Sequence, residues 1–277
     1  MNARRLRFVF LAPSAFIMLA LFWAPLLIVT AYSLLTRGPY GGVFRPWTIE
    51  SYTRTFDLLY VNILWRSVWI AAISTGLCLL LGFPLALYIA RAKRRKLLLL
   101  NLVMLPFWTS FLIRTYAWMF LLRDTGLINS MLLGLHVIAQ PLPLLFNTGA
   151  VILGLVYGYL PFMVLPLYAT LEKMDPLLID AAHDLGASPA TAVWRVVLPL
   201  SKPGMLAGCL LVFIPCLGAY LTPDLMGGGK TVMIGNLVQY QFTSSRDWPF
   251  GSAVSLLLMA VVLTVSLALR RRTEELL

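Results

Sequence analysis

The chain has 277 residues, of which 60% are hydrophobic and only 12% are charged, and its formal net charge is +11. A soluble domain carries about 25% charged residues, so this composition excludes an ordinary soluble protein and indicates an integral membrane protein. The basic residues stand at the ends of apolar runs, which is typical of residues that orient a protein in the membrane. We therefore expect the lipid bilayer, and no nucleic acid, as a partner.

The three cysteines lie inside apolar segments, where we expect them to pack as small apolar side chains. They are Cys78, Cys209 and Cys216. Their spacing predicts neither a disulfide nor a metal site.

The N-terminus resembles a signal peptide, since Arg4, Arg5 and Arg7 precede the apolar stretch 8–35. This stretch is longer than the apolar region of a signal peptide and has no convincing cleavage site. We therefore predict that it is retained as the first membrane span.

A membrane-spanning helix needs about 20 mostly apolar residues, and six segments of the chain meet this requirement. The predicted spans are 8–34, 64–90, 97–121, 147–171, 204–222 and 250–269. Pro106 is expected to kink the third span, and Arg114 interrupts its apolar run. The predicted fold class is an all-α membrane protein of about six transmembrane helices, with residues 1–277 in a single membrane domain.

The basic run from Arg91 to Lys96 sets the predicted orientation, because it is short and lies between two spans. Such runs stay on the cytoplasmic side of the membrane. Six spans then leave both termini in the cytoplasm. The longest cytoplasmic connection covers about residues 172–203.

Within this connection, residues 175–199, which we call the knuckle, carry the signals of two short helices with a corner between them. Asp175, followed by proline, is typical of a helix start, and Gly186 is typical of a helix end. Ser188, again followed by proline, begins a second helix that we expect to end before Pro199. These signals fit either an ordinary loop packed on its own helices or a compact element that projects from the membrane.

The knuckle also carries a sequence resemblance. Asp180-Ala181-Ala182 is followed by three residues, Gly186, nine residues and Val196-Val197-Leu198-Pro199. This pattern resembles the EAA loop of ABC importer permeases, which reads Glu-Ala-Ala, three residues, Gly, nine residues and Ile-x-Leu-Pro. Asp in place of Glu at position 180 and Val in place of Ile at position 196 are mild departures.

In that family the loop is a coupling element that docks in a cleft of a cytoplasmic ATPase subunit. The small residues of the motif permit close approach, and Asp180 and Asp184 are expected to pair with basic groups of the ATPase. The resemblance assigns ATPase coupling to Asp180, Ala181, Ala182, Asp184, Gly186, Val196, Leu198 and Pro199.

Two further segments, 106–118 and 218–230, resemble spermidine/putrescine permeases, specifically the first of the two permeases in such systems. The resemblance implies a bacterial inner-membrane importer subunit for a small polar solute such as a polyamine or a related amino compound. It implies a second, non-identical permease, two copies of an ATPase subunit and a soluble solute-binding protein as partners. It also implies no catalysis and no cofactor on this chain, with ATP bound by the partner subunit.

Polar and aromatic residues in or near the spans are candidates for the pathway, because charges in a membrane are usually functional and aromatic rings attract cations. The candidates for pathway or substrate contact are Trp108, Arg114, Tyr116, Tyr157, Tyr220 and Asp224. Interface and loop-anchoring roles are the alternatives for these residues.

Small residues one helical turn apart allow helices to approach closely in lipid. The pairs are Gly154 with Gly158 and Gly204 with Gly208. Each pair is expected to pack a helix, and either could face the partner permease. Lys230 stands in a sequence that ends like a phosphate-binding loop, but that pattern requires glycine at position 224, so no nucleotide site is predicted.

Two other classes of protein remain as alternatives. An ion-coupled secondary transporter would carry titratable groups near the bilayer midplane and internal repeats, whereas the acidic residues here lie almost entirely outside the spans. An intramembrane enzyme would need clustered catalytic groups. The two histidines, His136 and His183, lie in opposite loops and cannot form one site.

Overall fold

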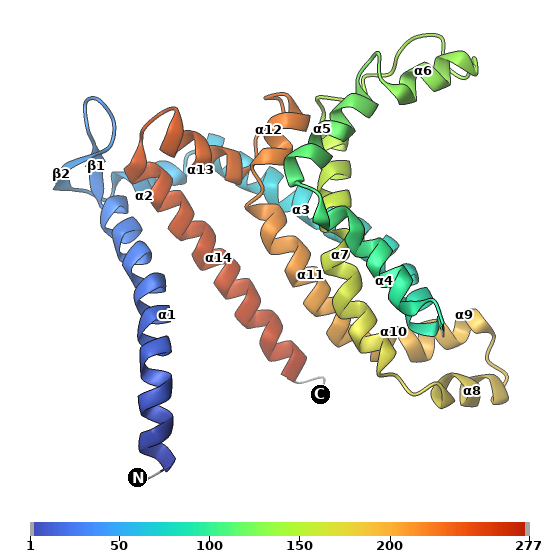
Figure 1. The fold of residues 1–277 in the computed structure, drawn as a ribbon. Coiled ribbons are helices and arrows are strands. Elements are labelled where there is room, and N and C mark those ends of the chain that lie inside the picture. Colours follow the sequence, from blue (N-terminus) through green and yellow to red (C-terminus); the bar gives the residue numbers. More distant parts are fainter. Residues whose placement is uncertain (1–2, 93, 275–277) are drawn as a thin grey trace. The chain divides into compact units, whose positions relative to one another are not determined.

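The structure is a computed structural model that describes residues 3–92 and 94–274, with side chains described for 11–92 and 94–267 (Figure 1). Lys93 of the predicted cytoplasmic run and the side chains of the terminal arginines therefore lie outside the described residues. The fold is helical apart from a hairpin of β1 (Leu35–Arg37) and β2 (Val43–Trp47), which pair antiparallel. The predicted all-α class is confirmed.

The chain forms two compact units. The first comprises Met1–Val61 and Leu237–Leu263, and the second comprises Asn62–Asn236 and Thr264–Leu277. The helices that begin in the first unit's segments are α1 (Ala3–Ser33), α2 (Glu50–Thr55), α3 (Leu58–Arg91) and α14 (Trp248–Glu274). The helices that begin in the second unit's segments are α4 (Lys96–Met104), η1 (Leu105–Trp108), α5 (Phe111–Leu122), α6 (Leu127–Gly134), α7 (Thr148–Glu172), α8 (Leu177–Asp184), α9 (Pro189–Ala192), η2 (Val193–Val197), α10 (Leu198–Leu200), α11 (Lys202–Leu217), α12 (Leu221–Gly227) and α13 (Ile234–Thr243).

Asp247 organises the first unit. Its Oδ2 accepts a hydrogen bond of 2.9 Å from Arg54, and its Oδ1 accepts one of 3.2 Å from the amide of Phe250 in the first turn of α14. The Asp247 side chain is only 3% exposed, so it is a buried charge that is paired. Burial lowers the pKa of Arg54, but hydrogen bonds to Tyr60 and Asp247 and the charge of Asp247 outweigh this and raise the pKa above its ordinary value.

The hairpin is tied to the turn beside Asp247. The Arg37 guanidinium donates to the carbonyl of Ser245 at 2.7 Å, and the amide of Gly42 donates to the carbonyl of Arg246 at 2.8 Å. These bonds attach a segment that precedes α2 to the segment that begins α14.

The core of the second unit is built around α7, which packs against α5, α11 and α12. Figure 1 shows α11 running beside α7. A Cβ atom on Gly204 would lie 2.5 Å from Thr170 Oγ1 and 2.9 Å from the Pro166 carbonyl oxygen, and one on Gly208 would lie 2.6 Å from Met163 Sδ. Two glycines therefore let α11 approach α7 more closely than any other residue allows.

The other glycine pair also packs inside the chain. A Cβ atom on Gly154 would lie 2.7 Å from Thr222 Cγ2 on α12, and one on Gly158 would lie 3.4 Å from the Phe111 ring on α5. The prediction of close packing is confirmed at Gly154, Gly204 and Gly208, whereas a Cβ atom on Gly158 would make an ordinary van der Waals contact. Each pair faces a helix of this chain.

Four described helices are long and apolar enough to cross a membrane: Leu11–Ser33, Leu58–Arg91, Thr148–Glu172 and Trp248–Leu267. Two bent pairs meet the same criterion, Lys96–Trp108 with Phe111–Gly134 at 89° and Pro189–Leu200 with Lys202–Leu217 at 68°. If each bent pair is one span, the total is six. Where the membrane surfaces cross these helices remains a prediction.

The third predicted span, 97–121, is not a continuous helix. It is interrupted at Thr109 and Ser110, whose backbones are extended, directly after a 3₁₀ turn that contains Pro106. Proline lacks an amide proton and disturbs the preceding turn, so the expected kink is a break. The fifth predicted span, 204–222, also stops early, because α11 ends at Leu217, two residues after Pro215.

The segments expected to be outside loops contain short helices that the sequence analysis missed. They are α2, α6, α12 and α13. Each has ten residues or fewer, so its hydrophobic period is too short to stand out in a pattern search.

Gly204→Ala is expected to destabilise the protein by about 1–3 kcal/mol, because the new methyl group overpacks against α7. The measurement is the thermal unfolding midpoint of the detergent-solubilised protein. Gly76→Ala on α3 is the matched control, because a Cβ atom there meets nothing within 4 Å. Helix propensity alone should leave that variant neutral or stabilised by up to about 1 kcal/mol. Equal midpoints for the two variants would contradict the close packing.

Candidate coupling and pathway sites

The first helix of the knuckle, α8, begins directly after Pro176, which is its N-cap residue. Asp175 Oδ1 accepts a hydrogen bond of 3.0 Å from the amide of Leu177. The regular helix begins at Leu177, one residue later than the predicted first position at Pro176. The prediction of Asp175 as the N-cap is therefore wrong by one residue, although its carboxylate still satisfies the amide of Leu177, which has no partner inside the helix.

The corner after α8 is a complete Schellman motif. The amide of Gly186 donates to the carbonyl of His183 at 2.8 Å, and the amide of Ala187 donates to the carbonyl of Ala182 at 2.9 Å. Gly186 has φ +83°, the left-handed conformation that this motif requires. Nothing lies within 4 Å of a Cβ built on Gly186, so backbone conformation and not crowding requires glycine here.

The second helix of the knuckle does not end before Pro199. Ser188 caps it by accepting a 3.2 Å hydrogen bond from the amide of Thr191, as predicted. The helix then continues through α9, η2 and α10 to Leu200. In η2 the amide of Leu198 bonds to the carbonyl of Val193, five residues back. Such a wide π-turn is one way in which a helix accommodates an irregularity of its bonding, and here it lies directly before Pro199, which has no amide to donate.

The two helices of the knuckle pack against each other, because α8 contacts both α9 and η2. Val197 is completely buried and anchors the second helix. Of the residues assigned to coupling, Asp180, Ala181, Asp184, Gly186 and Pro199 are exposed, while Ala182, Val196 and Leu198 are half-buried. The structure therefore brings the α8 motif residues to one exposed end of the second unit.

Large apolar side chains on the knuckle are also exposed, and the sequence analysis did not assign them to ATPase coupling. The exposed fractions are 68% for Leu177, 90% for Leu185 and 70% for Trp194. The sequence offered one signal of this exposure, because Leu185 directly precedes the corner glycine Gly186. An exposed apolar group beside carboxylates is typical of a protein–protein contact.

The six pathway candidates do not form one cluster. Tyr157 and Arg114 line one small cavity between α5 and α7, Tyr116 lines a second cavity, and Tyr220 lines a third. Trp108 is exposed on η1, and Asp224 is exposed on α12. The candidates therefore lie at several separate places within this chain.

Arg114 is the most unusual of these candidates. Its Nε and Nη1 atoms are buried and have no hydrogen-bond acceptor in the described part of the chain. Its guanidinium carbon lies 5.2 Å from the centroid of the Phe107 ring and 5.6 Å from that of Phe111. The faces of these two rings partly stabilise the positive charge of Arg114.

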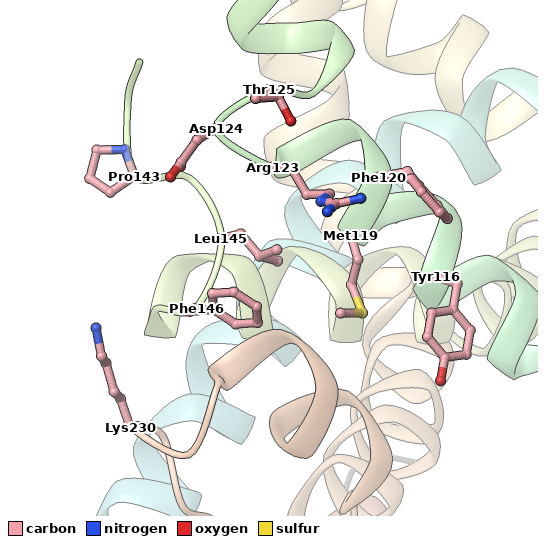
Figure 2. Close-up of a pocket in the computed structure, with 10 residues that line it drawn as sticks. All are labelled: Tyr116, Met119, Phe120, Arg123, Asp124, Thr125, Pro143, Leu145, Phe146 and Lys230. Carbon is pink, nitrogen blue, oxygen red and sulfur yellow. The ribbon is translucent and has the colours of Figure 1, made fainter. Parts of the chain in front are cut away.

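A cavity of about 710 Å³ is shown in Figure 2. Its residues come from α5, from the turn after α5, from the segment before α7 and from the loop after α12. They are Tyr116, Met119, Phe120, Arg123, Asp124, Thr125, Pro143, Leu145, Phe146 and Lys230. The lining thus combines an apolar surface with two basic residues and one acidic residue.

Comparison with known proteins gives a consistent result. The family model described as binding-protein-dependent transport system inner membrane component matches residues 79–274. The spermidine/putrescine transport system permease protein PotB of Haemophilus influenzae is 45% identical over 245 residues, which are 87% of this chain and 86% of that protein. PotB of Escherichia coli K12 is 45% identical over 239 residues, 86% of this chain and 87% of that protein.

Solved structures share the fold. One chain of a bacterial alginate ABC transporter, in complex with an alginate pentasaccharide-bound periplasmic protein, gives a TM-score of 0.76 at 17% identity and covers 98% of this chain and 94% of its own. A chain of the MetNI methionine ABC transporter gives a TM-score of 0.59 at 21% identity and covers 81% of this chain and 98% of its own. At these identities the likeness concerns the fold alone.

Gly186→Val is expected to open the corner of the knuckle, because a β-branched residue in the left-handed region costs about 1–2 kcal/mol or more. Amide hydrogen exchange at positions 186 and 187 should accelerate by roughly tenfold. Gly186→Asn is the matched control, since asparagine tolerates this conformation. Equal protection in the two variants would contradict the structural role of Gly186.

Proposed function

Because this chain belongs to the family of inner membrane components of binding-protein-dependent transport systems, we propose that it forms half of the translocation pathway of an importer for a polyamine or a related cationic amino compound. The chain is a multi-pass inner-membrane permease with the fold of type I ABC importer permeases. This membership decides against the alternative of an ion-coupled secondary transporter.

The observation that carries the proposal is the knuckle, which presents exposed leucine and tryptophan side chains beside Asp180 and Asp184. A cleft on an ATPase subunit that is apolar and rimmed by basic residues would complement this surface. The ATP would then be bound and hydrolysed on that separate subunit, and this chain would carry no cofactor and no catalytic residue. Asp180, Ala181, Ala182, Asp184 and Gly186 are the residues proposed to make the contact.

The knuckle is also connected mechanically to the membrane part of the chain. Its second helix, in which Val196, Leu198 and Pro199 lie, continues after a 68° bend into α11. Because α11 packs closely along α7, a displacement of the knuckle moves two long helices together. Closure of the ATPase subunits would in this way alternate the access of the pathway between the two sides of the membrane.

The proposal includes the remaining partners. A second, non-identical permease would complete the pore, and two ATPase copies would bind, one on each knuckle. With both termini in the cytoplasm, a soluble solute-binding protein would dock at the opposite side, where the cavity of Figure 2 offers Arg123 and Lys230 to an acidic surface. The substrate class is supported by the 45% identity to permeases named for spermidine and putrescine.

Leu185→Asp is expected to weaken association with the ATPase subunit by about tenfold or more, because buried apolar anchors contribute most of the free energy of such contacts. Leu185 is 90% exposed, so the substitution should leave the fold of this chain intact. The measurements are co-purification of the ATPase with the permease and substrate uptake in cells.

Leu127→Asp is the matched control, because Leu127 is also an exposed leucine but lies on α6, on the predicted outer side. It should keep the ATPase bound. Undiminished co-purification and uptake with Leu185→Asp would overturn the coupling role.

A further inference from the structure

A cavity of about 570 Å³ lies where α7 begins, at the end of this helix opposite to the knuckle. Arg66, Trp69 and Ile70 of α3 line one part of it. The segment that leads into α7 contributes Phe146, and the loop after α12 contributes Lys230. All of these residues belong to the second unit.

The cavity carries two positive charges that no carboxylate neutralises. Arg66 Nη1 donates to the carbonyl oxygen of Lys230 at 3.2 Å, which ties the loop after α12 to α3. Neither side chain forms an ion pair within the described part of the chain, and no acidic residue is among the described residues that line the cavity. Both side chains are exposed. This surface repels a cationic solute and attracts an anion.

The length of α3 indicates the height of the cavity in the bilayer. Its 34 residues extend about 51 Å, so a centred α3 exceeds a hydrocarbon core of roughly 30 Å by about 10 Å at each end. Arg66 is the ninth residue of α3, about 12 Å from its start. We therefore expect Arg66 at the edge of the hydrocarbon core, where lipid phosphate groups lie. Trp69 follows one turn deeper, and tryptophan is typical of this interface.

The apolar wall of the cavity is aromatic. Trp69 is 59% exposed and Phe146 is 45% exposed. Phe146 has φ +60°, which is rare for a bulky residue and persists only where the surrounding structure holds it. A Cβ atom on Gly228 would lie 2.6 Å from the Phe146 ring, so glycine at this position leaves room for the ring. The fold therefore supports a large apolar ring at the cavity and does not bury it in the core.

We propose that this cavity binds one anionic phospholipid, with its phosphate group between Arg66 and Lys230 and an acyl chain against Trp69 and Phe146. Guanidinium and ammonium groups are the usual protein partners of phosphate, and basic pockets between membrane helices are typical of lipid headgroup binding. The aromatic wall commits the site to a lipid, because a free phosphate ion gains nothing from apolar contact. The bound lipid would hold the loop after α12 against α3.

Removal of one charge at a time tests the phosphate contact. The variants are Arg66→Gln and Lys230→Gln in the complete, delipidated transporter. Native mass spectrometry during titration with phosphatidylglycerol counts the bound molecules and gives their dissociation constants, and phosphatidylcholine is the comparison lipid without net charge. Each variant should weaken the binding of one phosphatidylglycerol molecule about fivefold, because a basic residue near a lipid surface contributes about that factor. Phosphatidylcholine should bind the wild-type site less tightly than phosphatidylglycerol.

Arg45→Gln is the matched control for the loss of charge. Arg45 is also exposed, but it lies on β2 and is not among the described residues that line the cavity. This variant should keep the wild-type dissociation constants. Unchanged phosphatidylglycerol binding in Arg66→Gln, or an equal loss in Arg45→Gln, overturns the proposal.

A second pair of variants tests the apolar wall. Trp69→Ala should weaken phosphatidylglycerol binding about threefold to tenfold, because it removes apolar surface that the lipid covers. Trp65→Ala is the matched control, since Trp65 is 68% exposed on the same helix but is not among the described residues that line the cavity. Equal effects of the two substitutions would contradict the acyl-chain contact.

Inorganic phosphate in large excess separates a lipid site from a site for a small anion. It should not displace phosphatidylglycerol, because it cannot replace the apolar contacts. Displacement by phosphate, or equal affinity for phosphatidylglycerol and phosphatidylcholine, overturns the lipid assignment.

Receptor affinity provides the last discriminating measurement. Lys230 also lines the cavity of Figure 2, which the proposed function offers to the solute-binding protein, whereas Arg66 does not line that cavity. Arg66→Gln should therefore lower lipid binding and leave receptor affinity unchanged. A loss of receptor affinity with unchanged lipid binding would assign this surface to the receptor and overturn the proposal, while the proposed function would stand.

Discussion

The close contact between α7 and α11 is the constraint on which the rest of the second unit depends. In lipid, two apolar helices gain little from leaving the solvent, so their association relies on van der Waals packing at short distance. Gly204 and Gly208 make that distance accessible, because a side chain at either position would collide with α7. Nearer the N-terminus of α7, Gly154 lets α12 approach α7 closely in the same way. The positions of α11 and α12 are thus both set by glycines rather than by large apolar groups.

In the proposed coupling, this close packing would let a displacement of the knuckle reach both α11 and α7. The bend between α10 and α11 is held at Ser201, which is fully buried and whose hydroxyl donates to the Leu198 carbonyl at 2.9 Å. A flexible joint at this place would absorb any displacement of the knuckle. In the proposed coupling, a buried, hydrogen-bonded joint would transmit it to α11, and the glycine contacts would transmit it further to α7. A cavity of about 320 Å³ also lies at the end of α11, lined in part by Tyr220.

Local chemistry made the knuckle predictable from the sequence. Gly186 and Ser188 act on amides and carbonyls within a few residues of themselves, and their expected roles are those observed. Asp175 also acts locally, on the amide of Leu177, but from one residue before the N-cap. The end of the second helix was not predictable in the same way. Pro199 is a local stop signal, but the complete burial of Val197 favours continuation of the helix, and a single π-turn reconciles the two. Tertiary packing outweighed the local rule there.

The pathway residues show a second limit of the sequence. Residue type alone identified Arg114 and Tyr220 as candidates, because a charge in an apolar span is usually functional and an aromatic ring attracts cations. It could not show that they line different cavities, since this depends on where each span breaks and how each helix is rotated. Thr222 was overlooked because a threonine can satisfy its hydroxyl on its own helix, as Thr75 does on α3. Only the structure distinguishes the hydroxyl that is satisfied from the one that is not.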